Sequence, residues 1–202
     1  MGSLEPSLIT EEFSKRLSKL EKICNQFHLS LQSGCDETLK RMNRKYSVKE
    51  FLEVTQILRK YFKDANLTTD IIVGFPGETE EEFNKTYEFL NKINFYKMHV
   101  FKYSPREGTL ASKMQNQVDG KIKEYRSQKL IELSNTNQAK YNEIFSKKEY
   151  LEVLFEEKKD GIWEGYTTNY IKVCVKTEKN LENKILKVIP KQTQELQIMA
   201  SL

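Results

Sequence analysis

The sequence predicts an α/β fold in which a partial, TIM-like barrel of parallel strands precedes a small all-β barrel. Three strand-like segments, at residues 27–31, 69–73 and 98–103, alternate with amphipathic helical segments, which is the pattern of βαβ units. Each of the three ends in a polar loop that contains glycine or proline. From residue 147 onward the pattern changes to short strands at even spacing, which is typical of a small β-barrel.

The amino-terminal segment Ser3–Pro6 resembles the end of a strand, which brings the expected number of parallel strands to four. Thr10 is placed to cap a helix over residues 11–22, and a second short helix is expected over 37–44. A closed barrel needs more than four strands. The chain is therefore expected to hold only part of a barrel.

Two further helices begin with capping boxes, in which a Ser or Thr side chain and a Glu three residues later bond each other's backbone amides. The pairs are Ser47 with Glu50 and Thr79 with Glu82. Apolar residues at helical spacing follow each box and predict the buried faces of these helices: Phe51, Val54, Leu58 and Phe62 in the first, and Phe83, Tyr87, Leu90 and Ile93 in the second.

The most distinctive motif is Gly74-Phe75-Pro76-Gly77-Glu78, which directly follows the apolar strand 69–73. Two glycines permit positive φ and a close approach of the backbone to a ligand, and Pro76 stiffens the turn between them. In parallel α/β folds such loops gather at the carboxyl ends of the strands, where ligands bind. The sequence thus predicts a ligand site at that edge.

Residues 117–145 predict one long amphipathic helix, with a break expected near Asn135 or Asn137. A linker helix packed on the partial barrel is a simpler interpretation than a partner-binding helix. Five strands are expected after it, at 150–156, 162–166, 170–175, 184–189 and 196–199. The expected units are therefore the partial barrel at 1–114, the linker helix at 115–146 and the small barrel at 147–202.

Composition narrows the function classes. A net charge of +4 is too small to indicate nucleic-acid binding by itself, and no apolar stretch or signal peptide is apparent, so a cytoplasmic location is expected. The three cysteines, Cys24, Cys35 and Cys174, have no CxxC spacing and predict neither a disulfide framework nor a thiolate metal site. His28 and His99 fall within strands, where buried or hydrogen-bonded imidazoles are a simpler expectation than a metal site.

Several motifs, in order along essentially the whole chain, resemble the radical S-adenosylmethionine tRNA methylthiotransferases. These are Ser3–Pro6, the segment His28-Leu29-Ser30-Leu31-Gln32-Ser33-Gly34, the loop at 74–78 with its preceding strand, and Tyr103-Ser104-Pro105-Arg106-Glu107-Gly108-Thr109. The tail around 165–173 resembles a TRAM domain, a small RNA-binding barrel. The sequence around His28 is most similar to that of the MtaB group.

The resemblance implies addition of a methylthio group to carbon 2 of threonylcarbamoyladenosine beside the tRNA anticodon, with isopentenyladenosine as the alternative substrate. It also implies S-adenosylmethionine and two 4Fe-4S clusters as cofactors of the whole enzyme. The CxxxCxxC motif that the family uses for its cluster is missing here. We therefore expect a carboxyl-terminal fragment that is inactive alone, has tRNA and S-adenosylmethionine as partners, and has an exposed sheet edge that favours dimerisation.

The resemblance places one wall of the S-adenosylmethionine site in this chain. The expected cofactor-binding residues are Ser30, Gln32, Ser33, Arg44, Gly74, Phe75, Gly77 and Glu78. Arg44 or Arg41 could pair with the methionyl carboxylate, with Arg44 preferred, and solvated surface is the simpler interpretation of both. Glu78 could instead cap the following helix.

The remaining candidates concern the substrate. Tyr103, Ser104 and Arg106 are expected to face the substrate base, and Tyr166, Tyr170, Lys172 and Lys176 to contact RNA phosphates and bases. Packing of the small barrel is an equal alternative for Tyr170, and Trp163 is expected in its core. Two rival functions stay open: an RNA-binding module without catalysis, and a phosphate-binding barrel enzyme that uses the loop at 74–77.

Overall fold

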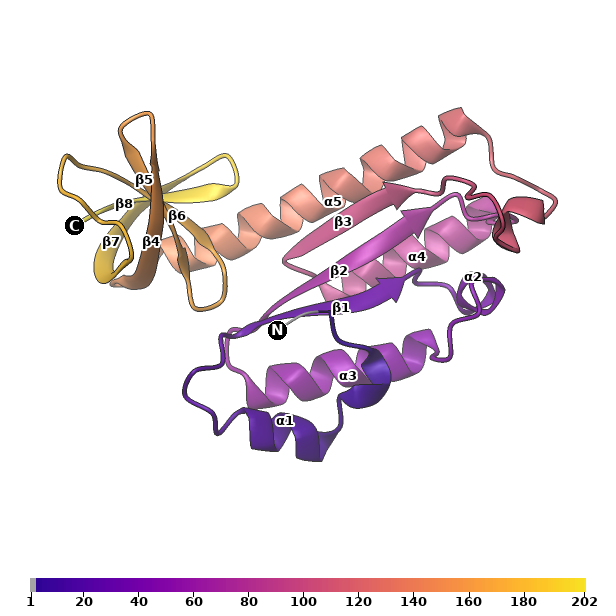
Figure 1. The fold of residues 1–202 in the computed structure, drawn as a ribbon, viewed down its shortest axis with the longest axis horizontal. Helices are drawn as coiled ribbons and strands as arrows, with labels where there is room; N and C mark the ends of the chain where they lie inside the picture. Colours follow the sequence, from indigo (N-terminus) through magenta and orange to yellow (C-terminus); the bar gives the residue numbers. More distant parts are fainter. Residues whose placement is uncertain (1–2) are drawn as a thin grey trace.

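The computed structural model describes residues 3–202 (Figure 1). A three-stranded parallel sheet, ordered β1-β2-β3, forms the first part of the chain. Its strands are β1 (Gln26–Gln32), β2 (Asn66–Val73) and β3 (Lys97–Lys102). The helices between and around them are η1 (Pro6–Leu8), α1 (Glu11–Leu17), α2 (Asp36–Arg41), α3 (Val48–Tyr61), α4 (Glu80–Ile93), η2 (Ala111–Lys113) and α5 (Gly120–Ser146).

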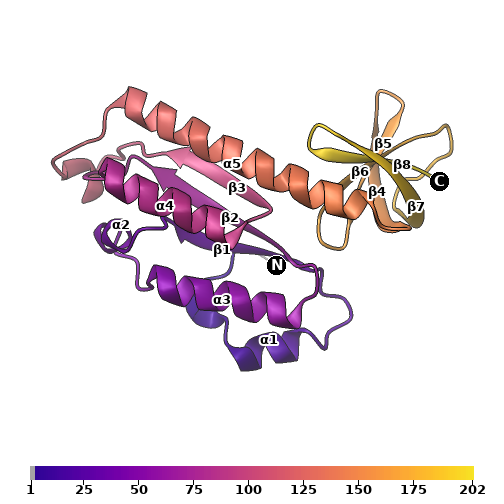
Figure 2. The same ribbon diagram turned by 180° about the vertical axis from the view of Figure 1, so that it is seen from behind.

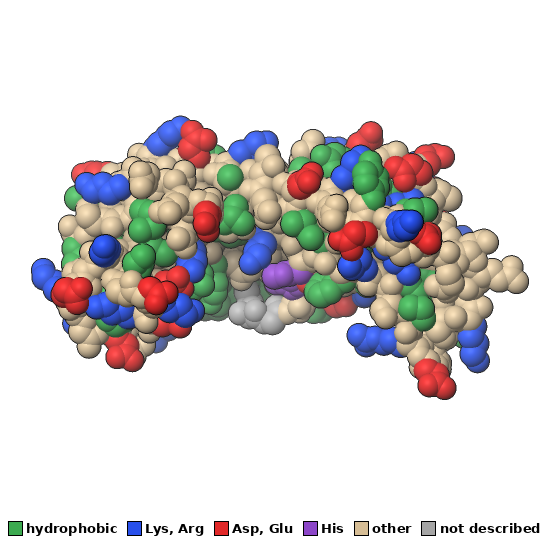
Figure 3. Space-filling view, turned by 90° about the horizontal axis from the view of Figure 1, so that it is seen from above, with side chains coloured by type: hydrophobic (Ala, Val, Ile, Leu, Met, Phe, Trp, Pro, Cys, Tyr) green, Lys and Arg blue, Asp and Glu red, His purple; other side chains and the backbone are tan. Residues whose placement is uncertain are grey.

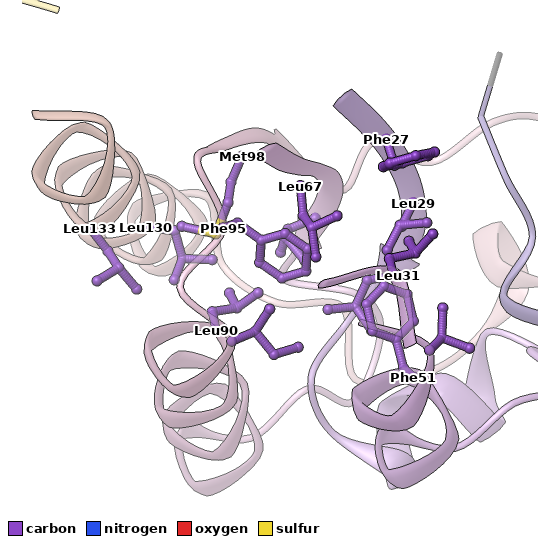
Figure 4. Close-up of a cluster of buried hydrophobic side chains, with 14 of the residues drawn as sticks. Phe27, Leu29, Leu31, Phe51, Leu67, Leu90, Phe95, Met98, Leu130 and Leu133 are labelled. Atoms are coloured by element: carbon purple, nitrogen blue, oxygen red, sulfur yellow. The ribbon is translucent and has the colours of Figure 1, made fainter. Parts of the chain in front are cut away.

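The larger helices cover one face of this sheet and leave the other open. In Figure 1 the strands lie in front of the helices, and in Figure 2 the order is reversed. Alternate strand residues point to the helical side, where Leu29, Leu67 and Met98 pack with Leu90 and Leu130 (Figure 4). The residues between them, such as His28, Asp70 and His99, therefore lie on the open face. This open face is what a partial barrel exposes.

The amino-terminal segment gives one correction. Ser3–Pro6 does not form a fourth strand, because only Leu4 pairs with β1, in a single parallel bridge to Leu29. The 3₁₀ helix η1 begins directly afterwards at Pro6, whose ring fixes φ and removes a backbone donor. The sheet consequently has three strands in the described part of the chain.

The helices match the predicted positions with shifted ends. Thr10 caps α1, but α1 ends at Leu17 rather than at residue 22. Helix α2 ends at Arg41, because Asn43 adopts a left-handed φ of 58°. Both capping boxes are present at the starts of α3 and α4. Helix α5 runs unbroken through Asn135 and Asn137, contrary to the expected break.

The carboxyl-terminal part is a closed five-stranded barrel with strand order β4-β5-β6-β8-β7. The strands are β4 (Leu151–Lys159), β5 (Ile162–Thr167), β6 (Lys172–Lys176), β7 (Lys184–Gln194) and β8 (Gln197–Ser201). Only β6 and β8 pair in parallel, and Trp163 is buried in the barrel core as expected. Tyr170 lies outside any strand, because it adopts a positive φ of 62° in the turn before β6.

The small barrel contacts the first part of the chain at the amino-terminal end of the sheet, far from the carboxyl edge (Figure 1). The Asn66 side chain donates to the Asn169 carbonyl at 2.7 Å, and the Asn169 side chain donates to the Asp64 carbonyl at 3.1 Å. Tyr96, which directly precedes β3, and Phe145 of α5 belong to the barrel core. None of the helices described combines the length and hydrophobicity needed to cross a bilayer.

Candidate functional site

The carboxyl ends of the three strands surround a hollow of about 500 Å³. Its walls combine apolar and polar side chains: Gln32, Asp70, Ile72, Phe75, Phe101 and Tyr103. Ser104 and Arg106, from the loop after β3, complete one rim. The structure thus brings together residues from all three of the strand-end loops that the sequence singled out.

The loop Gly74–Gly77 is fixed from several sides. Gly74 and Gly77 have φ values of 70° and 79°, which favour glycine. The Gly77 amide donates to the Asn116 carbonyl at 2.9 Å. A Cβ on Gly74 would lie 2.3 Å from Cγ of Lys123, so α5 approaches this glycine closely. Phe75 is thereby held at the wall of the hollow.

Glu78 lies behind the loop rather than at the hollow. Its carboxylate accepts hydrogen bonds from the Gly74 amide at 2.8 Å and from Nη1 of Arg126 at 2.7 Å. The side chains of Glu78 and Arg126 are each only 3% exposed. Burial raises the pKa of Glu78. The hydrogen bond from the Gly74 amide and the charge of Arg126 act to lower this pKa, but the net shift is upward. The pair holds the loop against α5.

Of the two arginines considered for the methionyl carboxylate, Arg41 already has protein partners. Its Nη1 donates to Glu82 at 2.9 Å and its Nε to the Pro76 carbonyl at 3.2 Å. The hydrogen bonds to Glu82 raise the pKa of Arg41. Arg44 is half-buried, and within residues 3–202 its side chain makes no hydrogen bond or ion pair, but it does not line the hollow.

The end of β1 places its three candidates differently. A bulge between Leu29 and Gln32 gives Gln32 a φ of 70° and turns it into the hollow. Ser30 lies on the open face of the sheet, short of the hollow. Ser33 is buried on the helical side, where its hydroxyl bonds Thr86 of α4 at 3.2 Å.

Tyr103 forms the wall opposite Gln32. Its ring meets Phe75 edge to face, with centroids 5.2 Å apart, and its carbonyl accepts a hydrogen bond from Lys123 at 3.1 Å. The Tyr103 hydroxyl is buried and has no hydrogen-bond partner among residues 3–202. An unpaired buried hydroxyl beside a hollow is available to a ligand.

The candidates on the small barrel lie at the other end of the sheet (Figure 1). The rings of Tyr166 and Tyr170 are 6.1 Å apart, and both tyrosines line a shallow hollow on the barrel surface. Tyr170 is 53% exposed, which favours a surface contact over packing. Lys172 donates to Glu164 at 2.7 Å, whereas Lys176 is exposed.

Two functional features escaped the sequence analysis. Arg126 is far in sequence from the loop that it supports, so no local motif connects the two. Asp70 lines the hollow and pairs with His28, with Nε2 3.2 Å from Oδ2. A signal for Asp70 did exist: Thr68, Asp70 and Ile72 alternate with the buried Ile71 and Val73 and so share the open face.

The residues present fit part of a nucleoside cofactor but not a metal cluster. The aromatic walls, the glycine backbone and the unpaired Tyr103 hydroxyl suit an adenosine group. In the part of the chain that is described, no three His, Cys, Asp or Glu side chains are grouped to hold a metal ion. Cys24 is exposed, while Cys35 and Cys174 are buried in separate places.

A model of the radical SAM superfamily matches residues 3–90. The chain is 41% identical over 193 residues to the threonylcarbamoyladenosine tRNA methylthiotransferase MtaB of Bacillus subtilis, covering 93% of this chain and 43% of that protein. It is also 41% identical over 151 residues to the tRNA-2-methylthio-N(6)-dimethylallyladenosine synthase of Alkaliphilus oremlandii, covering 75% of this chain and 32% of that protein. The chain belongs to the radical S-adenosylmethionine tRNA methylthiotransferase family.

A solved structure supports the fold of this family member. Coproporphyrinogen III oxidase (HemN) from Escherichia coli, a radical SAM enzyme, matches with a TM-score of 0.57 at 14% identity, covering 82% of this chain and 45% of that one. The chain spans less than half the length of the curated methylthiotransferases it matches. The predicted fold class, a partial radical SAM barrel followed by a small all-β barrel, is confirmed.

Proposed function

We propose that this chain supplies part of the catalytic barrel and an RNA-binding barrel of a tRNA methylthiotransferase. The single observation that carries the proposal is the hollow at the carboxyl edge, where the Gly74–Gly77 loop, Gln32 and Tyr103 converge. Its position agrees with the ligand site of parallel α/β barrels. The identity to MtaB extends across both the sheet and the small barrel.

The proposed substrate is threonylcarbamoyladenosine in tRNA, which would receive a methylthio group at carbon 2. This choice follows the MtaB relative, which combines 41% identity with an alignment over 93% of the chain. Other dimethylallyladenosine synthases align over 91% of the chain at 37% identity, so isopentenyladenosine stays the alternative substrate.

Phe75 and the backbone of the Gly74–Gly77 loop would hold the adenosine part of S-adenosylmethionine, with Gln32 toward the ribose. S-adenosylmethionine, when bound, supplies the radical that activates the substrate carbon. Tyr103, Ser104 and Arg106 would face the substrate base from the rim. In this proposal the enzyme has two 4Fe-4S clusters, which residues outside 3–202 would hold. The described residues alone would therefore be inactive.

The small barrel would bind the tRNA backbone through exposed lysines and stack bases on Tyr166 and Tyr170. An RNA-binding module without catalysis is the second candidate, because the cysteines described are scattered. The two candidate functions differ in one measurable property. If the chain is part of a methylthiotransferase, it should bind S-adenosylhomocysteine in the hollow, and an RNA-binding module should not. A cytoplasmic location follows from the proposed tRNA substrate.

The proposal also includes pairing of two copies through the outer edge of β1. That edge has one bridge, at Leu4, while the other side of β1 pairs with β2 along its length. Sedimentation of the purified chain across a range of concentrations tests this part, and a constant monomer mass would refute it without touching the proposed reaction.

The decisive experiment is mass spectrometry of tRNA nucleosides from the source organism with and without the gene. Loss of the methylthio group from threonylcarbamoyladenosine, restored by the gene but not by a Gly74→Val copy, supports the proposal, since a side chain there collides with Lys123. Loss from isopentenyladenosine instead would establish the alternative substrate. An unchanged nucleoside profile would overturn the enzymatic function.

A further inference from the structure

A row of polar side chains in mutual contact crosses the open face of the sheet below the hollow. The Gln26 amide donates to Oγ1 of Thr68 at 3.0 Å, and Nδ1 of His28 lies 3.0 Å from the same oxygen. Nε2 of His28 lies 3.2 Å from Oδ2 of Asp70. Viewed from above, the outline of the molecule is hollowed along this side, and histidine atoms lie in the recess (Figure 3).

The two ring nitrogens of His28 contact different partners. Nε2 faces the Asp70 carboxylate, which accepts only when ionised, so a proton on Nε2 would stabilise this contact. In the neutral imidazole, Nδ1 is then an acceptor for the Thr68 hydroxyl. The imidazole is thus held at both nitrogens, and it fixes one oxygen of Asp70. The second oxygen, Oδ1, is left without a protein partner among residues 3–202.

Asp70 lines the hollow together with Ile72, Phe75 and Phe101, and its side chain is 30% exposed. Lys102 and Arg106 line the same hollow. Within residues 3–202 it pairs with no lysine or arginine. Placing a charge against apolar and aromatic walls costs free energy unless hydrogen bonds compensate. A ligand with an N–H or O–H donor would supply the missing hydrogen bond.

We propose that Asp70 is a ligand-binding residue that accepts a hydrogen bond from an adenosine nucleoside in the hollow, and that His28 is its positioning residue. The identity of the nucleoside rests on the proposed function, in which both the cofactor and the substrate contain adenosine. Phe75 and Phe101 line the same hollow and offer apolar surface to a flat base, whose exocyclic amine is a donor that a carboxylate oxygen can accept from.

The test is nucleoside binding to the full chain, followed by NMR. The wild-type chain should prefer adenosine over purine riboside, which lacks the exocyclic amine, by about tenfold. Asp70→Asn should abolish this preference, because the amide that His28 orients presents N–H to the ligand amine. His28→Gln should reduce the preference about threefold without contacting the ligand. Asp160→Asn, in the turn after β4, is the matched control and should leave the preference unchanged.

A measurement on the wild-type chain covers the case in which a variant fails to fold. Adenosine should shift the imidazole ¹⁵N resonances of His28, and purine riboside should not. Repeating the titration with S-adenosylhomocysteine and with threonylcarbamoyladenosine identifies the source, since the nucleoside that loses affinity in Asp70→Asn is the one that Asp70 binds. Equal binding of adenosine and purine riboside by the wild type, or a preference kept by Asp70→Asn, would overturn the inference.

The outcomes of the nucleoside-binding test can be distinguished from those of the tRNA nucleoside analysis. If deletion of the gene removes the methylthio group but Asp70→Asn keeps its preference, the proposed function stands and the His28–Asp70 pair only joins two strands. If the preference depends on Asp70 but the tRNA is unchanged, the nucleoside site stands and the reaction must be sought elsewhere.

Discussion

At the residue scale, the shape of the Gly74–Gly77 loop depends on a buried ion pair. Glu78 binds the Gly74 amide and Arg126 at once, and neither charged side chain is more than 3% exposed. Breaking such a pair leaves a buried charge without compensation. The loop that walls the hollow is therefore supported by a side chain from α5.

Arg126→Met is expected to destabilise the chain by about 3 kcal/mol, because the Glu78 carboxylate stays buried without its cation. Urea unfolding followed by circular dichroism measures this loss. Glu78→Gln combined with Arg126→Met should recover part of it, since no unpaired charge is left. Arg16→Met, which removes an arginine with 80% exposure, is the control and should change stability little. A loss below about 1 kcal/mol in Arg126→Met would show that the pair is dispensable.

His99 gives a second prediction at this scale. Partial burial and the charge of Lys97 lower the pKa of His99, while the charge of Asp70 raises it. An NMR titration of the His99 imidazole should therefore give a midpoint below 6.5. Asp70→Asn should lower the midpoint further and Lys97→Met should raise it. Shifts of the same sign in both variants would contradict the assignment of these charges.

Sequence reasoning named five of the eleven residues that line the hollow, but not which way each side chain turns. Gln32 and Ser33 are neighbours in one motif, yet only Gln32 enters the hollow, because the bulge in β1 sends Ser33 to Thr86. Arg44 was preferred over Arg41, and the structure shows Arg41 engaged with Glu82. These orientations follow from tertiary contacts, which a single sequence does not display.

At the element scale, the start of α4 is connected through Arg41 to α2 and to the Gly74–Gly77 loop. The Thr79–Glu82 capping box begins the helix, and Glu82 also binds Arg41 of α2. Burial acts to raise the pKa of Glu82, but hydrogen bonds from Arg41 and the Thr79 amide outweigh it, so the net pKa is lowered. A group whose pKa is lowered in the folded state stabilises the fold at pH values above its unfolded pKa.

Glu82→Gln should therefore cost about 2 kcal/mol at pH 7. The wild type should lose this advantage as the pH falls from its unfolded pKa, near 4.5, through the lower folded pKa. Urea unfolding of both proteins at several pH values between 7 and 3 measures the difference. Glu12→Gln, at a side chain with 82% exposure, should show no such dependence. A difference that stays constant down to pH 3 would mean that the Glu82 charge contributes nothing.

Element types could be predicted from local patterns, while their ends depended on contacts beyond them. The capping boxes fixed the starts of α3 and α4 because the signal is contained in four residues. The break expected in α5 was wrong, since Asn137 is buried and packed within an intact helix. Tyr170 was expected in a strand, but its positive φ places it in a turn.

At the scale of the whole molecule, the two barrels are joined at the amino-terminal end of the sheet, opposite the hollow (Figure 1). Asn66 and Asn169 are buried and, with the Asp64 carbonyl, form a polar joint. Tyr96 and Phe145 continue the small-barrel core into the first part of the chain.

This joint should make the two parts unfold together. Trp163 is the one tryptophan of the chain and is buried in the small barrel, so its fluorescence reports that barrel alone. Circular dichroism at helical wavelengths reports the helices around the sheet, because the small barrel has none. In urea the two signals should change at the same concentration in the wild type.

Asn66→Ala should separate the two transitions. The Asn169 carbonyl would lose its buried donor, which costs about 1–3 kcal/mol, and the joint would weaken more than either core. The fluorescence transition should then move to lower urea than the dichroism transition. Asn84→Ala on the exposed side of α4 is the matched control and should leave them coincident. Transitions that already differ in the wild type would mean that the small barrel folds independently, and the geometry between the hollow and the small barrel would then not be fixed by this joint.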